Sequence, residues 1–235
     1  MTIRSSATMS NTRKKYRPRF EPVPEGIDYF DLPQVSNSDL SSLHYETSKI
    51  ERIGNIEKAY EFGTLVDAVI TEHDRINVIK RQIDGKPINA IDFERVTRMR
   101  EAFFRDEEAR TLLKYSDCQK VMIRNVPLAY RGVSFVLPMR CKWDMWIDHM
   151  WFGGDLKSTM ATSQQQFEAA CQHFDYDRQR AFYMTIAGSD QDFLIGVSKI
   201  NFKVFKMYIK RGDRFFNSGM SKMLRLAFKY HMMYA

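Results

Sequence analysis

Two neighbouring segments of β-type sequence, each carrying an acidic residue, constrain this chain more than any other feature. Residues 141–147 read CKWDMWI, and residues 151–157 read WFGGDLK. Side chains two positions apart in a strand point to the same face of the sheet. Asp155 and Lys157 therefore share one face, and the residue between them turns into the core. If the segments pair through the turn that joins them, Asp144 comes to lie beside this pair.

Such a hairpin could bind a divalent metal ion and position a water molecule. Two carboxylates form a hard oxygen site suited to Mg²⁺ or Mn²⁺, and an adjacent ammonium can hold a water that the metal activates. These groups are the minimum equipment for hydrolysing a phosphodiester. The pattern D-x(10)-D-x-K is short, however, and the alternative is a hairpin whose charged side chains are simply solvated.

Two helical stretches carry further motifs. Residues 62–67 read FGTLVD and run on to Glu72, and residues 179–183 read QRAFY. The order G-T-x-x-D-x(4)-E, D-x(10)-D-x-K, Q-x-x-x-Y resembles the PD-(D/E)XK nuclease superfamily, and within it the RecE-like exonucleases of exodeoxyribonuclease VIII type and the RecB-type nuclease domains. The segment VSNSDL at 35–40 is similar to the opening of the first helix in RecE-type domains, and the resemblance covers roughly 33–206.

The resemblance implies an α/β fold with a restriction-endonuclease-like core, in which helices flank a mixed central sheet. It also implies a metal-dependent deoxyribonuclease that degrades linear duplex DNA, 5′ to 3′, in recombination or DNA processing. Mg²⁺ or Mn²⁺ would be the cofactor. The metal ligands would be Asp67, Asp144, Asp155 and the Leu156 carbonyl. Lys157 would orient the attacking water, and Gln179 and Tyr183 would position the water or the phosphate.

Asp67 departs from the family pattern. The family usually carries histidine four residues after the helix glycine, where this chain has Asp67. A carboxylate can bind the same metal, and Glu72 is expected to support the site. Two alternatives stay open: a non-catalytic DNA-binding or assembly protein on a nuclease fold, and a structure-specific or single-strand endonuclease.

The net charge of +7 is concentrated at the two ends of the chain. Residues 1–20 hold six basic and no acidic side chains, residues 199–235 hold nine basic and one acidic, and the stretch between holds 21 basic against 28 acidic. Basic blocks bind polyanions through counterion release, although a solubilising tail is the competing interpretation for residues 1–20. The candidate DNA contacts are Lys203, Lys206, Lys210 and Arg211, with Ser158 and Thr159 either donating to a phosphate or capping the next helix.

At 235 residues and 44% hydrophobic composition, the chain can bury one substantial core. It has no apolar run long enough to cross a membrane and no secretory signal, so a cytoplasmic protein of a bacterium, or of a virus within its host cell, is expected. Cys118, Cys141 and Cys171 are expected to be buried reduced thiols. The resemblance adds a homo-oligomer, often a ring, and a single-strand annealing protein as partner.

The sequence predicts a basic disordered tail over 1–26 and a single domain over 27–235 with a basic C-terminal segment from 199. Apolar periodicity and capping residues predict the secondary structure of this domain. The expected helices are 36–45 (capped by Ser36 or Ser38), 56–72, 92–114, 163–187 and 218–234, and the expected strands are 120–124, 126–130, 133–147, 151–157, 193–200 and 202–209.

Overall fold

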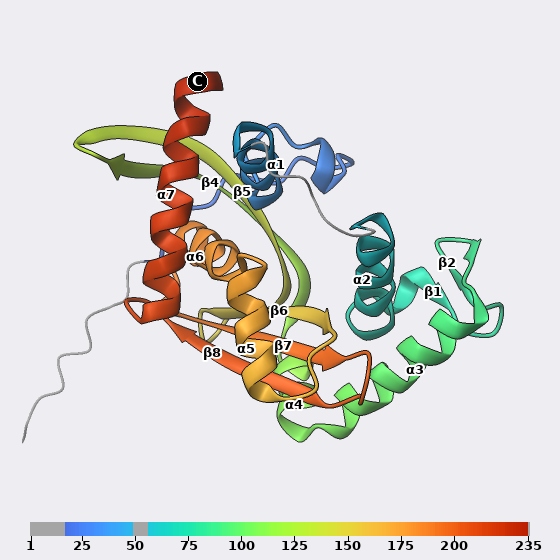
Figure 1. Ribbon diagram of the computed structural model, residues 1–235. Helices are drawn as coiled ribbons and strands as arrows, with labels where there is room; N and C mark the ends of the chain where they lie inside the picture. The colour runs from blue at the N-terminus through green and yellow to red at the C-terminus, as the bar shows by residue number, and fades with distance from the viewer. Residues whose placement is uncertain (1–16, 49–55, 235) are drawn as a thin grey trace, which may run out of the picture.

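The computed structural model of the protein describes residues 17–48 and 56–234 and has an α/β fold (Figure 1). Its central sheet is mixed, with the strand order β4-β5-β6-β7-β8, and helices flank it, which confirms the expected fold class. The strands are β4 (Asp117–Tyr130), β5 (Val133–Ile147), β6 (Phe152–Thr159), β7 (Gln191–Ser198) and β8 (Val204–Lys210).

The pairing of the strands places the acidic segments next to each other. β4 and β5 form a long antiparallel hairpin, and β6 turns back to pair antiparallel with the end of β5. β7 lies parallel to β6, and β8 closes the sheet antiparallel to β7. The hairpin expected between 141–147 and 151–157 is therefore confirmed, as is the extension of the sheet by the strand after 202.

Helices cover both faces of this sheet. On one face, α6 and α7 pack over a cluster that includes Trp143 and Trp146, while α2 and α3 enclose a second cluster around Met145 and Leu156 on the other. Side chains of β7 alternate between the two faces, as the strand period requires. The helices are α1 (Asn37–Ser48), α2 (Ile56–Ile70), α3 (Ala90–Arg105), α4 (Glu107–Lys114), α5 (Gln164–His173), α6 (Tyr176–Ala187) and α7 (Arg214–Tyr234).

Two helices that the sequence predicts as continuous are each divided in two. The stretch 92–114 breaks at Asp106, whose side chain accepts a hydrogen bond from the Ala109 amide at 2.9 Å and caps α4. The stretch 163–187 breaks at Asp175, which adopts a left-handed conformation with φ of +56°. β4 shows the opposite difference, because it runs through Asn125 without the expected interruption.

The helix boundaries differ from expectation by a few residues. Ser36 is the cap of α1: its amide donates to the Asp39 carboxylate at 2.7 Å, and its hydroxyl accepts from the Asp39 amide at 3.3 Å. α1 ends three residues later than expected, at Ser48, and α2 ends two residues earlier, at Ile70. α7 begins at Arg214, four residues before the expected start.

Two smaller features differ from the sequence-based expectation. A small antiparallel sheet of β1 (Ile76–Asn77), β2 (Gln82–Ile83) and β3 (Lys86–Pro87) precedes α3. Residues 17–26, expected in the tail, contact the body through a bridge from Glu21 to Ile123 and through Phe20, whose ring stacks on Trp151. Residues 1–16 of that tail lie outside the described residues.

The thiols follow expectation in part. Cys141 and Cys171 are buried, but Cys118 is exposed near the start of the edge strand β4, so that expectation is wrong there. Within the described ranges, no helix combines the length and the hydropathy needed to cross a membrane.

Candidate active site

Asp144 and Asp155 lie where two paired strands separate. The ladder between β5 and β6 extends from the turn to the pair Met145↔Gly154, and the two aspartates are the next residue on each strand. An Asp144 carboxylate oxygen accepts a hydrogen bond from the Leu156 amide at 2.8 Å, in place of the backbone acceptor that a continued ladder would supply. We call this point of separation, with Asp144 on β5 and Asp155 on β6, the fork. It holds both carboxylates at one end of the hairpin.

Two glycines allow β6 to lie against large aromatic rings just before Asp155. A Cβ atom on Gly154 would overlap the ring of Phe193, and one on Gly153 would overlap the rings of Trp143 and Trp146. Only residues without a side chain fit such a close approach. The pair of glycines in WFGGDLK thus fixes the strand that presents Asp155.

Two cations balance the charge of Asp155, which is buried. The Lys157 ammonium forms an ion pair with one carboxylate oxygen, and Arg180 Nη1 lies 3.4 Å from the other. Lys157 also lies over the ring of Tyr176, with Nζ 4.8 Å from the ring centroid. Burial lowers the pKa of Lys157, but the charges of Asp155, Tyr176 and Asp144 and the hydrogen bond to Asp155 together outweigh burial, so the net direction is upward. Lys157 is therefore charged at neutral pH.

Arg180 connects the ion pair at Asp155 to a second buried carboxylate. This arginine was not identified from the sequence. It is fully buried on α6, and its Nε lies 3.6 Å from a carboxylate oxygen of the fully buried Asp192 on β7. Its guanidinium carbon lies 4.2 Å from the Tyr183 ring centroid and 5.1 Å from one ring of Trp143. Buried charges of this kind persist only when paired. The available signal was an arginine directly after Gln179, at the start of the largely apolar run 181–187.

Burial and neighbouring carboxylates make the ionisation of Asp67 and Asp144 less favourable and so raise their pKa values. Burial, and then the negative charge of Asp155, raise the pKa of Asp144 to about 7. Burial, and then Asp144, raise the pKa of Asp67 well above its usual range. Asp67 reaches this environment from α2, which packs against β6. Three carboxylates from α2, β5 and β6, of which Asp155 is buried and the other two are half-buried, thus repel one another.

The donor chemistry of these residues fits a hard divalent cation, which would relieve that repulsion. Yet among residues 17–48 and 56–234, no three His, Cys, Asp or Glu side chains are gathered as they would be around a metal ion. Asp155 is instead paired with Lys157 and Arg180, and Asp144 accepts a hydrogen bond from the Leu156 amide. Lysine and arginine supply the positive charge at the fork.

Gln179 and Tyr183 project from α6 one turn apart. The Gln179 side-chain oxygen is buried and accepts no hydrogen bond from any described residue. The Tyr183 ring packs edge-on against Trp143, with centroids 5.2 Å apart, and burial raises the pKa of its hydroxyl. Glu72 pairs with Arg75 at 2.9 Å, its amide donates to the Asp67 carbonyl oxygen at 3.2 Å, and its charge adds to the causes that raise the pKa of Asp67.

Ser158 and Thr159, the last two residues of β6, do not cap a helix. The Thr159 hydroxyl accepts a hydrogen bond from the Ala161 amide at 3.1 Å and so fixes the turn after β6. Ser158 is half-buried at the end of the same strand. The cap of α5 is instead Ser163, whose hydroxyl accepts from the Gln166 amide at 3.3 Å.

Two of the four basic residues expected to contact DNA have partners within the protein. Lys206 Nζ lies 2.7 Å from Asp106 and 3.0 Å from Glu108, because β8 packs beside the start of α4. Arg211 donates to the carbonyl oxygens of Met184 at 2.9 Å and Ser189 at 2.8 Å. The other two, Lys203 and Lys210, are exposed at the ends of the edge strand β8.

The comparisons with known proteins give distant structural similarity only. No family model matches the chain, and no curated protein matches it. A phage-related exonuclease from Haemophilus somnus 129PT is similar over 83% of this chain and 81% of its own, with 11% identity and a TM-score of 0.43. An alkaline exonuclease from Laribacter hongkongensis, also solved in complex with dAMP, is similar over 85% of this chain and 88% of its own, with 11% identity and TM-scores of 0.37 and 0.38. Similarity at this level carries no conclusion about function, which must come from the residues of the site.

Proposed function

We propose that this protein is a metal-dependent nuclease that hydrolyses the phosphodiester backbone of DNA. One observation carries the proposal: the half-buried Asp67 and Asp144 and the buried Asp155, from three separate elements, come together beside Lys157, and burial and then neighbouring carboxylates raise the pKa values of Asp67 and Asp144. Folding carboxylates together against their repulsion is costly, and it is typical of sites that bind a cation or act in catalysis.

The residues of the fork have complementary roles in this proposal. Asp67, Asp144, Asp155 and the Leu156 carbonyl would hold Mg²⁺ or Mn²⁺. A bound divalent cation supplies water activation and neutralises charge on the phosphate. Lys157, whose pKa is raised beside Asp155, holds the attacking water and stabilises negative charge that develops on the phosphate.

The helix α6 contributes orientation. Gln179 has a buried side-chain oxygen that is available to accept a hydrogen bond from the water or its neighbours. Tyr183, clamped between Trp143 and Arg180, has little rotational freedom and presents a hydroxyl that burial keeps protonated. Arg180 holds Asp155 from below, so the carboxylate keeps its place at the fork.

We further propose a RecE-like exonuclease that degrades linear duplex DNA from a 5′ end in recombination. The support is the ordered motif set, together with the packing of α2 against β6 and of α6 against β5. Lys203, Lys210 and the basic residues of 1–16 would contact the DNA backbone. A homo-oligomer and a single-strand annealing protein are the partners that this class implies.

A non-catalytic DNA-binding protein is the second candidate. The observation in its favour is that Lys157 and Arg180 already balance the charge of Asp155 without a metal. Such a protein would bind DNA equally well with and without divalent cations and would cut none.

The deciding experiment offers linear and closed-circular duplex DNA side by side, with Mg²⁺, Mn²⁺ or chelator. An exonuclease degrades the linear form alone, and only with metal. Cutting of the circular form would indicate an endonuclease, and intact DNA under every condition would leave the binding protein as the better account.

A further inference from the structure

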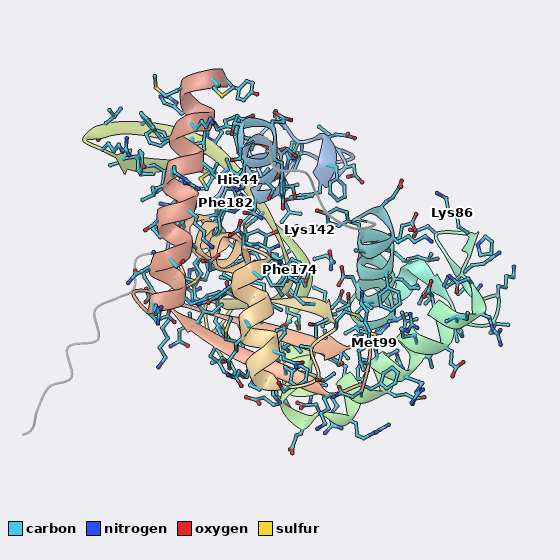
Figure 2. All side chains as sticks on the ribbon, in the orientation of Figure 1. His44, Lys86, Met99, Lys142, Phe174 and Phe182 are labelled. Carbon is cyan, nitrogen blue, oxygen red and sulfur yellow. The ribbon has the colours of Figure 1, made fainter. Side chains whose placement is uncertain are left out.

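An exposed aromatic residue, Phe174, stands at the junction of α5 and α6 (Figure 2). Its side chain is 61% exposed, although apolar rings of this size are ordinarily buried. The junction is held in place: Asp175 adopts a left-handed conformation with φ of +56°, and its carboxylate pairs with Lys222 Nζ at 2.7 Å. The exposure of Phe174 is therefore imposed by a fixed turn.

A series of ring contacts connects this surface residue to the fork. The rings of Phe174 and Tyr176 have centroids 6.0 Å apart and planes inclined by 34°. Tyr176 in turn lies beneath the Lys157 ammonium, 4.8 Å from Nζ to the ring centroid, and Lys157 pairs with Asp155. The aromatic rings thus extend from Lys157, the proposed phosphate contact, through Tyr176 to the solvent-exposed Phe174.

A second exposed aromatic residue lies on α2, which packs against β6. Tyr60, 68% exposed, precedes Asp67 by seven residues, so the two side chains lie on one face of the helix. Tyr60 and Asp67 therefore lie on the helix that packs against the strand carrying Lys157. Between them, a Cβ atom on Gly63 would meet no described atom within 4 Å. Among the described residues, this face of α2 therefore leaves room beside Tyr60.

We propose that Phe174, Tyr176 and Tyr60 form a stacking surface for the unpaired bases of single-stranded DNA beside the fork. Bases within a duplex are stacked on one another and do not offer their faces, whereas the bases of a single strand stack on aromatic side chains regardless of sequence. A nucleotide whose phosphate meets Lys157 brings its base within reach of Tyr176, and the next base within reach of Phe174. The inference depends on the proposed function, since it takes Lys157 as the phosphate contact.

The test measures the binding of a fluorescently labelled single-stranded oligonucleotide to the full chain in chelator, so that no strand is cut. Phe174→Ala should weaken binding roughly 5- to 150-fold, the loss that one stacked base accounts for. Phe174→Trp should keep wild-type affinity, and Phe174→Leu should behave like the alanine variant because an apolar surface alone does not suffice. Tyr234→Ala is the matched control: Tyr234 is 59% exposed and lies at the far end of α7 (Figure 1).

An oligonucleotide with one base removed adds a second, independent measurement. Moving the abasic position along the strand should reveal one or two positions that weaken wild-type binding, and those positions should have no further effect in Phe174→Ala. Equal binding of intact and abasic strands by the wild type would overturn the stacking surface, as would equal behaviour of Phe174→Ala and Tyr234→Ala.

The failure of this inference and that of the proposed function have different signatures. A wild type that cuts linear duplex DNA with Mg²⁺ but binds single strands without any contribution from Phe174 refutes the stacking surface alone. A wild type that cuts no DNA refutes the nuclease, whatever the binding experiment shows.

Discussion

Replacing Arg180 with methionine removes a fully buried cation while leaving a side chain of similar length. In the wild type, Arg180 lies 3.4 Å from Asp155 and 3.6 Å from Asp192, and all three residues are buried. Breaking a buried ion pair by removing one partner costs about 3–5 kcal/mol of unfolding free energy, because the remaining charge is left uncompensated. Arg180→Met leaves two such carboxylates, although Lys157 still balances Asp155. The expected loss is therefore about 3–5 kcal/mol, a large share of the stability of a domain this size.

Denaturant unfolding at neutral pH measures this loss, and a double-mutant cycle identifies its cause. Arg180→Met combined with Asp192→Asn removes the cation and the anion together and should recover part of the stability that the single change loses. The surface substitution Glu107→Gln, at an exposed carboxylate on α4, should change the unfolding free energy by less than about 0.5 kcal/mol.

The unfolding free energy that Arg180→Met loses should change with pH in a definite direction. Burial raises the pKa of Asp192 and Arg180 lowers it, so the pKa rises further when Arg180 is removed. An acid whose folded pKa lies above its unfolded value, about 3.9, loses stability as pH rises between the two. The stability difference between wild type and Arg180→Met should therefore be smaller near pH 5 than near pH 8. A loss below about 1 kcal/mol, or a deficit that does not shrink on acidification, would refute the reasoning.

Three further results are expected. Lys157→Ala should lower the cleavage rate roughly 10²- to 10³-fold with little change in Mn²⁺ affinity, because an ammonium is no ligand; a rate that excess metal restores would contradict this role. Asp67→Asn should weaken Mn²⁺ binding in a calorimetric titration, while Asp67→His should retain activity and shift preference toward Mn²⁺; unchanged binding in Asp67→Asn would remove this residue from the site. Deleting residues 1–16, which hold four basic side chains, should make the salt dependence of duplex binding shallower by about 0.9 for each phosphate that the segment neutralises; an identical slope would mean that the segment does not touch DNA.

The parts of the fold that the sequence predicts correctly depend on local periodicity. Alternation around Asp144 and Asp155 identifies two paired strands, and apolar spacing identifies α2 and α6. Local periodicity does not predict the helix breaks at Asp106 and Asp175, because the apolar spacing continues across both positions. In each case a short polar side chain favours a turn or cap over a helix interior, and that preference is decided by tertiary partners such as Lys206 and Lys222.

The roles of charged residues are harder to predict, since they depend on contacts far apart in the sequence. The basic and aromatic neighbours of Lys206 suggest a DNA surface, but α4 brings Asp106 to it across a hundred residues. In the sequence, Arg180 is only one of the residues between Gln179 and Tyr183. Nothing in the local pattern indicates that it pairs with Asp192. Sequence patterns locate the fork, whereas the ion pairs that hold it require the structure.

The central claim is that the carboxylates of the fork make this protein a metal-dependent nuclease. Its most direct test is the rate at which linear duplex DNA is degraded with Mg²⁺ by wild type, Asp155→Asn and the charge-matched control Glu107→Gln. Circular dichroism would establish that all three are folded. The account predicts that wild type and Glu107→Gln degrade DNA at equal rates and that Asp155→Asn does not degrade it. Degradation by Asp155→Asn at the wild-type rate would contradict the account.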